Sequence, residues 1–168
     1  MMLDRKYFER PATELAPDLI GKYLCRRTED GVIRARIVET ECYFGEEDTA
    51  CHAHKGRTER TKAMYEAGGV TYVYLCYGIH SLLNIVTGAK DHPEAVLIRG
   101  VEGAVGPGRA TKFMKITTSD NALPLCEESG IWIEDSGEKK PKIARTARIG
   151  IDYATKADRE RKWRFVVK

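Results

Sequence analysis

The central segment of this 168-residue chain reads Ile37-Val38-Glu39-Thr40-Glu41-Cys42-Tyr43-Phe44-Gly45. It ends a run that starts at Val32, directly after the turn dipeptide Asp30-Gly31. This arrangement predicts the returning strand of a hairpin, from Val32 to Phe44. Because side chains alternate between the two faces of a strand, we expect Glu39, Glu41 and Tyr43 to project to the same side.

The segments around this strand predict one domain, residues 1–168, of the α+β class. We expect strands at residues 22–27, 32–44, 70–77, 81–87, 94–102, 131–134, 143–151 and 163–167, and helices at residues 11–22, 61–67 and 106–116. Residues 45–61 are polar and irregular, which indicates a loop long enough to carry function. Strands outnumber helices and hairpins recur, and this favours a curved, largely antiparallel sheet flanked by short helices.

The composition is typical of a globular protein, with 42% hydrophobic and 32% charged residues. No apolar run approaches the roughly 18 residues that a spanning helix needs, and the first residues lack the apolar core of a signal peptide. The five cysteines are odd in number and fit no disulfide framework, which favours reduced thiols. We therefore expect a cytoplasmic protein without membrane association.

The net charge of +3 is unevenly distributed along the chain. Residues 139–168 contain eleven Lys or Arg against three acidic residues, a local net charge of +8. A second basic cluster comprises Lys55, Arg57, Arg60 and Lys62. Segregated positive charge favours a polyanionic partner, because neutralised phosphates release counterions. An ordinary solvated surface is the alternative interpretation.

Candidate catalytic and binding residues lie on the predicted strands. Glu41 is either a general base for water or a surface ion-pair partner. The run Tyr72-Val73-Tyr74-Leu75-Cys76-Tyr77-Gly78 places Tyr72 and Tyr74 on one strand face, where a role in the core competes with a role in binding. Tyr77 precedes Gly78 at an expected turn, and an exposed aromatic ring there suits insertion into a base stack. Acid and stacked aromatic rings together indicate an enzyme that binds a flat ring and activates water beside it.

Polar residues inside apolar segments raise further hypotheses. Burial of Asn84 or Arg99 costs free energy unless each is paired, so each is a structural buttress or a reader of a polar ring edge. His52 lies in the 45–61 loop, and it is either incidental or a hydrogen-bonding partner for substrate or backbone. With Cys51 and His54 it also suggests zinc, but a fourth ligand is not apparent and the spacing matches no ordinary zinc motif. We expect no metal and no other cofactor.

Several motifs, in order, resemble the alkyladenine (3-methyladenine) DNA glycosylase family, and they cover nearly the whole chain. They are Arg36 to Gly45 with Asp48 and His52, Tyr72-Val73-Tyr74 with Tyr77-Gly78, Leu83-Asn84-Ile85, Val96 to Glu102, Gly106-Pro107-Gly108, Ala147-Arg148-Ile149-Gly150-Ile151 and Trp163-Arg164-Phe165. The resemblance implies base excision repair by a monomeric enzyme that acts on double-stranded DNA containing damaged purines. It also implies a fold similar to the C-terminal domain of methionyl-tRNA formyltransferases, and a nucleoid-associated location if the source is bacterial.

The resemblance also implies a role for each matching residue. Glu41 would deprotonate the attacking water, and Arg99 would help to orient it. Tyr43 and Tyr74 would stack on the flipped base, with His52 completing the pocket. The remaining roles would be the exclusion of guanine by Asn84 and the filling of the vacated stack by Tyr77. From the charge distribution, we expect the basic residues Lys55, Arg57, Arg60, Lys62 and Arg109 to contact the DNA backbone.

The chain departs from the family pattern at three places. Only three residues separate Glu102 from Gly106, where relatives usually carry a longer helical insertion, and this bears on DNA affinity. Arg109 replaces the usual lysine after Gly-Pro-Gly. Ile79 and His80 differ from the hydrophobic-aromatic pair of some members, which bears on lesion preference. The sequence does not rank 3-methyladenine, 7-methylguanine, hypoxanthine and ethenoadenine as substrates.

Two other classes of function compete with the glycosylase interpretation. A non-catalytic nucleic-acid binding module would explain the basic and aromatic residues, but it has no need of an unpaired carboxylate beside an aromatic clamp. A metal-dependent hydrolase using Cys51, His52 and His54 would lose activity in the presence of a chelator.

Overall fold

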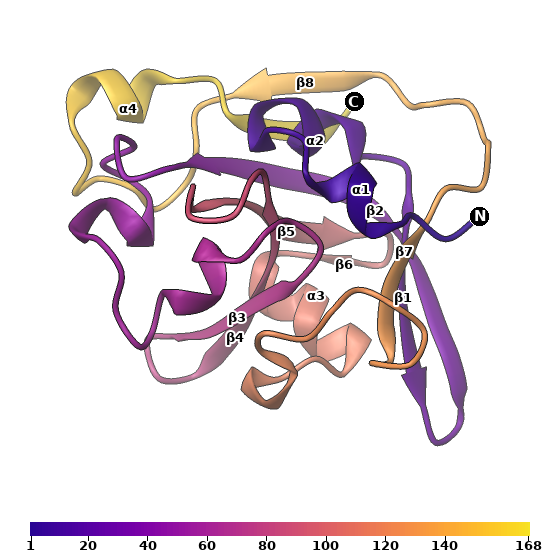
Figure 1. Cartoon of the computed structure of the whole chain (residues 1–168). Coiled ribbons are helices and arrows are strands. Elements are labelled where there is room, and N and C mark those ends of the chain that lie inside the picture. Colours follow the sequence, from indigo (N-terminus) through magenta and orange to yellow (C-terminus); the bar gives the residue numbers. More distant parts are fainter.

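The computed structural model describes all residues, 1–168, and its architecture is a strongly curved antiparallel sheet with a few short helices (Figure 1). The main strand order is β3-β4-β5-β2-β1-β7, while β6 pairs with β5, and β9 pairs with both β2 and β8. The strands are β1 (Tyr23–Thr28), β2 (Gly31–Phe44), β3 (Thr71–Cys76), β4 (His80–Thr87), β5 (Glu94–Val101), β6 (Ala104–Val105), β7 (Ile131–Glu134), β8 (Ile143–Thr146) and β9 (Arg164–Val167).

The long strand β2 joins the two halves of the sheet. Its first part pairs with β1, and its second part pairs with β5 on one side and with β9 on the other. The register between β2 and β5 shifts on either side of Glu39. Such an irregularity bends a strand and increases its twist, so it contributes to the half-barrel curvature.

Short helices cover the sheet and close its edges. They are α1 (Arg5–Phe8), α2 (Ala12–Asp18), α3 (Pro107–Met114) and α4 (Lys156–Glu160), with 3₁₀ turns η1 (His52–Lys55), η2 (Lys62–Tyr65) and η3 (Thr118–Asp120). Helix α2 packs against β2 and β5, and α3 packs against β4 and β5. No helix is long and apolar enough to cross a membrane.

The two faces of the sheet pack against different parts of the chain, as strand alternation requires. The main core contains Ile85 and Ile98 together with apolar side chains of α2 and α3. On the opposite face, Tyr72 and Val86 pack against the loop that carries η1 and η2. Tyr43, Tyr72 and Tyr74, which were singled out in the sequence, lie on this second face.

The predicted α+β class and curved antiparallel sheet are confirmed, whereas several element boundaries are wrong. The helix expected at 11–22 ends at Asp18, because Gly21 adopts a φ of +91° and its N–H bonds to the carbonyl of Ile37. The strand expected at 143–151 ends at Thr146, because Arg148 turns into the protein interior. The helix expected at 61–67 is the 3₁₀ turn η2, and the sequence did not predict α1, α4 or β6.

Candidate active site

Glu41 is the fully buried carboxylate at the centre of the candidate site, on the second half of β2. The hydroxyl of Tyr43 donates a hydrogen bond to Glu41 Oε1 over 2.8 Å, and the backbone N–H of Ile149 donates to Oε2 over 2.7 Å. Arg99 Nε lies 3.8 Å from the same Oε2. Burial raises the pKa of Glu41, while Arg99 and these hydrogen bonds oppose that shift. The site therefore holds a strengthened base in an oriented position.

Glu39 lies beside Glu41 and anchors the neighbouring cations. Its Oε2 accepts hydrogen bonds from Arg99 Nε at 3.1 Å and from Arg164 Nε of β9. Arg99 thus bridges the two carboxylates of β2, which agrees with the expectation that they share a face with Tyr43. Arg99 also lines the adjacent pocket.

The pocket beside this carboxylate has a volume of about 340 Å³ and aromatic walls. It is lined by Tyr43, His52, Arg60, Met64, Tyr72, Tyr74, Leu75, Cys76, Tyr77, Leu82, Asn84, Leu97, Arg99, Pro107, Ile149, Gly150, Ile151 and Tyr153. These residues come from strands β2 to β5, the 3₁₀ turns, α3 and the segment after β8. A largely apolar cavity with a few convergent polar groups suits a small planar ligand.

His52 contributes a neutral ring to one wall of the pocket. Its Nδ1 lies 3.1 Å from the hydroxyl of Tyr72, and its ring contacts that of Tyr74 edge-on with centroids 4.4 Å apart. Burial, assisted by the positive charge of Arg60, lowers the pKa of His52 to about 4. The imidazole is therefore neutral near pH 7, which suits contact with an electron-poor ring.

Asn84 is buried on β4 at the wall of the same pocket. It faces Tyr72 across the β3–β4 pair, and its Nδ2 donates to the Tyr72 carbonyl over 3.2 Å. This bond fixes the side-chain amide, so its remaining polar atoms keep a defined position relative to the cavity.

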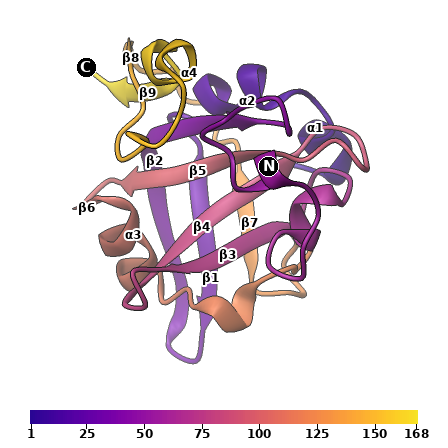
Figure 2. The same ribbon diagram turned by 90° about the vertical axis from the view of Figure 1, so that its left-hand side faces the viewer.

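Figure 2 shows the β3–β4 hairpin. Tyr77 lies in the turn of this hairpin, with Gly78 and Ile79. Its side chain is 92% exposed, and its φ of +52° is unusual for a residue other than glycine. Ile79 is 73% exposed. This exposed aromatic ring at the pocket rim, on a strained turn, packs against no other part of the protein.

A family model described as methylpurine-DNA glycosylase (MPG) matches residues 6–105 and 102–168. The chain belongs to this family. DNA is therefore the polymer on which the family acts, and the resemblance noted from the motifs is confirmed.

Curated relatives from distant organisms carry the name "Putative 3-methyladenine DNA glycosylase". The relative from Psychrobacter cryohalolentis is 44% identical, and the alignment covers 88% of this chain and 84% of the relative. The one from Methanocella arvoryzae is 41% identical over 98% of this chain and 91% of the relative. The relative from Borreliella burgdorferi is 39% identical over 99% of this chain and 96% of the relative.

The basic residues considered as contacts to the DNA backbone differ in their surroundings in this glycosylase-family chain. Arg60 lines the pocket, and its guanidinium lies 5.4 Å from the ring centroid of Tyr74. Arg57 is paired with Asp91, and Lys62 with Glu59. Lys55 and Arg109 are exposed. Only Arg60 among the five borders the cavity.

The three residues considered for zinc do not converge. His54 Nδ1 bonds to the carbonyl of Glu46 at 2.7 Å, whereas His52 faces Tyr72. Burial raises the pKa of the Cys51 thiol to about 12, which disfavours the thiolate that a metal requires. No group of three or more His, Cys, Asp or Glu side chains in the protein is arranged to hold a metal ion.

The segment after β8 contains site residues that sequence reasoning missed. Ile149 contributes a backbone N–H to Glu41, and no side-chain pattern can reveal such a contact. Tyr153 lines the pocket, and its hydroxyl donates to the carbonyl of Ala50 over 2.7 Å. The sequence pattern around Arg148 and Ile149 predicts a strand, whereas in the structure β8 ends at Thr146.

Proposed function

We propose that this chain is a monofunctional DNA glycosylase of base excision repair. It flips an alkylated or deaminated purine out of duplex DNA and hydrolyses the N-glycosidic bond, leaving an abasic site. The observation that carries this proposal is the buried carboxylate of Glu41, which two hydrogen bonds orient and whose partners Tyr43, Arg99 and Ile149 line an aromatic pocket. A module that only binds DNA has no use for a carboxylate whose burial costs free energy.

Recognition of the base rests on the aromatic walls. In the proposed complex, Tyr43 and Tyr74 stack on the extruded purine, and neutral His52 contacts its edge. Extrusion costs a few kcal/mol, and least where damage has already weakened pairing or stacking. A purine alkylated at a ring nitrogen is electron-poor and stacks favourably on electron-rich tyrosines. Asn84 would obstruct the amino group of guanine.

Hydrolysis rests on Glu41. Burial strengthens its carboxylate as a base, and Arg99 opposes loss of its charge. Glu41 would take a proton from water as the sugar develops oxocarbenium character, and its negative charge would stabilise that transition state. Arg99, held between Glu39 and Glu41, would orient the water. The proposed reaction uses no metal and no other cofactor.

The remaining parts of the proposal concern DNA engagement and assembly. Tyr77 would fill the space that the flipped nucleotide leaves in the stack. Lys55, Arg57, Arg60, Lys62 and Arg109 would contact phosphates. The enzyme would act as a monomer, with residues 1–168 forming a single glycosylase domain. We also infer similarity of the half-barrel to the C-terminal domain of methionyl-tRNA formyltransferases.

The first test is a single-turnover glycosylase assay on duplexes carrying hypoxanthine or an alkylated purine, with EDTA present. The parent should form abasic sites, and Glu41→Gln should slow base release by roughly 10²–10⁴-fold, the usual range for a general base. Lesion binding should persist, because glutamine keeps the shape of the side chain. Glu102→Gln, which alters an exposed carboxylate next to β5, should match the parent.

Either of two results would contradict the proposal. Equal single-turnover rates for the parent and Glu41→Gln would remove Glu41 from the chemistry. Lesion binding by the parent without base release from any substrate would identify a damage-recognition module instead.

A further inference from the structure

Arg148 is a buried cation that the proposed chemistry does not use. It is 5% exposed and lies between β8 and the pocket-lining residues that follow. Its Nη1 donates to Asp48 Oδ2 over 2.6 Å and to the carbonyl of Cys42 over 2.9 Å. Its Nη2 donates to Asp48 Oδ1 over 3.0 Å and to the carbonyl of Asp158 over 3.2 Å. This bidentate arrangement requires a guanidinium and cannot be reproduced by lysine.

The partner of Arg148 is itself held in place. Asp48 Oδ2 accepts from the backbone N–H of Phe44 over 3.0 Å, and Oδ1 accepts from that of Ala50 over 3.1 Å. The guanidinium carbon of Arg148 lies 5.0 Å from the ring centroids of both Tyr43 and Trp163. Arg148 therefore ties the 45–51 loop, the end of β2 and the segment after β8 into one unit.

The next residue in the chain connects this unit to the catalytic carboxylate. Ile149 donates its N–H to Glu41 Oε2, directly after the residue that the guanidinium holds. On its other oxygen, Glu41 accepts from Tyr43, whose ring Arg148 contacts. Both hydrogen bonds to Glu41 thus come from groups that Arg148 fixes.

We propose that Arg148, paired with Asp48, is a positioning residue that sets the orientation of the Glu41 carboxylate through Ile149 and Tyr43. This inference rests on the proposed function, because it assigns Arg148 a role in the same reaction. Arg148 does not line the pocket. It acts through the backbone of one residue and the ring of another.

Stability alone is a poor reason for this ion pair. A buried pair loses solvation, and well-packed apolar residues of similar volume are often equally stable or more so. The Nε of Arg148 is moreover buried without a hydrogen-bond partner, which adds a further cost. What the pair provides is a fixed geometry, which apolar packing specifies less strictly.

The charged groups around Glu41 predict the direction of the effect. Arg99 from β5, Arg148 from the segment after β8, and Tyr43 on its own strand face this carboxylate, while Arg164 of β9 contacts the adjacent Glu39. Burial raises the pKa of Glu41. Four contacts lower it: the charge of Arg99, the hydrogen bonds from Ile149 and Tyr43, and the charge of Arg148. Displacing Ile149 and Tyr43 therefore raises that pKa further, and less of the base is ionised at neutral pH.

The test compares Arg148→Lys and Arg148→Met with the parent. The substrates are duplexes carrying 7-methylguanine. Because this leaving purine is already cationic, the acid limb of the pH–rate profile reports on the ionisation of Glu41. We expect the maximal single-turnover rate to fall roughly 10–100-fold, the effect of misplacing a catalytic group. The acid limb should move to higher pH, while the Kd for lesion duplex stays within about threefold. Lysine keeps a charge but not the bidentate bonds, so Arg148→Lys should not restore the parent profile.

A second ion pair provides the matched control. Arg26 makes two hydrogen bonds to Asp120, at 3.0 and 3.2 Å, and neither residue lines the pocket. Arg26→Met should lower thermal stability without moving the acid limb. Arg148 would have only a structural role if two results came together: the acid limb of the pH–rate profile stays at the parental pH in both Arg148 variants, and their rates fall only in proportion to the fraction of folded protein.

A measurement without catalysis separates this inference from the proposed function. The carboxyl ¹³C signal of Glu41, assigned by its loss in Glu41→Gln, is titrated in the parent and in folded Arg148→Lys. An upward shift of the Glu41 pKa supports the positioning role even if the parent releases no base. Coincident titration curves overturn it, whatever the assay of base release shows.

Discussion

At the scale of single residues, the fixed amide of Asn84 leads to a prediction about substrate selection. Its bond to the Tyr72 carbonyl holds it against the pocket, where the amino group of guanine would meet it. We predict that Asn84→Ser increases release of guanine from undamaged duplex by roughly tenfold, within the range that a small change in pocket volume produces. Loss of the hydrogen bond should also cost about 1 kcal/mol of stability.

The assay measures base release from undamaged and hypoxanthine-containing duplexes in parallel. Asn121→Ser is the matched control, because Asn121 accepts a hydrogen bond from the N–H of Val73 but does not line the pocket. A selectivity in Asn84→Ser equal to that of the control would show that Asn84 only supports the sheet.

His52 links the pocket to the pH dependence of stability. Its pKa in the folded protein is about 4, against an ordinary value of 6.5. Between these values the unfolded chain binds a proton that the folded protein does not, so stability falls as the pH is lowered from about 6.5 to about 4. The loss amounts to roughly 2–3 kcal/mol. We predict that His52→Gln removes this part of the pH dependence, as measured by denaturant unfolding at several pH values.

The adjacent histidine provides the comparison for this prediction. His54 is exposed on the same 3₁₀ turn and bonds to a backbone carbonyl. His54→Gln should therefore keep the parental pH dependence over the same interval. If His52→Gln also keeps the parental pH dependence, the lowered pKa of His52 is not its cause.

At the scale of elements, the turn of the β3–β4 hairpin costs stability at the residue that the proposed function needs for binding DNA. Tyr77 pays a conformational cost for its positive φ, which glycine at this position would not. We predict that Tyr77→Gly raises stability by roughly 0.5–1 kcal/mol and weakens binding to a lesion duplex at least about tenfold, through loss of the exposed ring. Thermal unfolding and equilibrium binding measure the two effects separately.

The other hairpin provides the control for this prediction. Val32 is 50% exposed beside the β1–β2 turn and does not line the pocket. Val32→Ser should leave the binding of lesion duplex unchanged. Unaltered binding in Tyr77→Gly would argue that the exposed ring does not enter the DNA.

Elements also show why part of the site was predictable. Alternation along β2 placed Glu39, Glu41 and Tyr43 on one face, and the contacts of Arg99 and Tyr43 agree with that placement. Alternation is a local property, so sequence alone carries it. The strand prediction for the segment after β8 is wrong, because the buried ion pair between Arg148 and Asp48, 100 positions apart in the chain, overrides the strand-like composition of this segment. The hydrogen bond from Ile149 to Glu41 depends on that long-range contact, and no local pattern encodes it.

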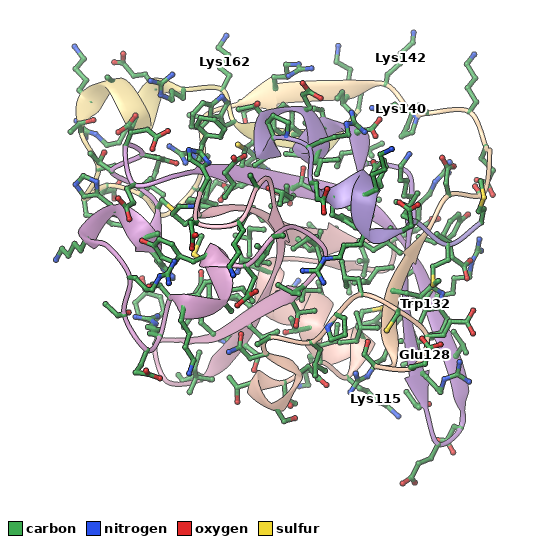
Figure 3. All side chains as sticks on the ribbon, viewed as in Figure 1. Lys115, Glu128, Trp132, Lys140, Lys142 and Lys162 are labelled. Carbon is green, nitrogen blue, oxygen red and sulfur yellow. The ribbon has the colours of Figure 1, made fainter.

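At the scale of the whole molecule, positive charge lies on two separate surfaces. Lys142 and Lys162 extend from one edge of the molecule, while Lys140, just before β8, lies with its ammonium group 3.4 Å from Asp18 (Figure 3). Arg60 lies at the pocket, Lys55 precedes it in the same loop, and Arg109 is exposed on α3. A phosphate contact releases counterions, and each contact adds about 0.9 to the slope of log K against log salt. The slope therefore identifies which surface meets the DNA.

We predict that the pocket-side surface dominates, because the flipped nucleotide brings its flanking phosphates to the pocket rim. Replacing Lys55, Arg60 and Arg109 together by glutamine should lower the salt slope by about 2–3, if each contacts one phosphate. The triple replacement of Lys140, Lys142 and Lys162 removes the same charge from the other edge and should lower it by less than about 1. The measurement is the Kd for a lesion duplex over a series of salt concentrations. A larger effect from the second triple variant would move the DNA path to the β8 edge, and the pocket would then have to receive its base from a duplex that approaches over the C-terminal segment.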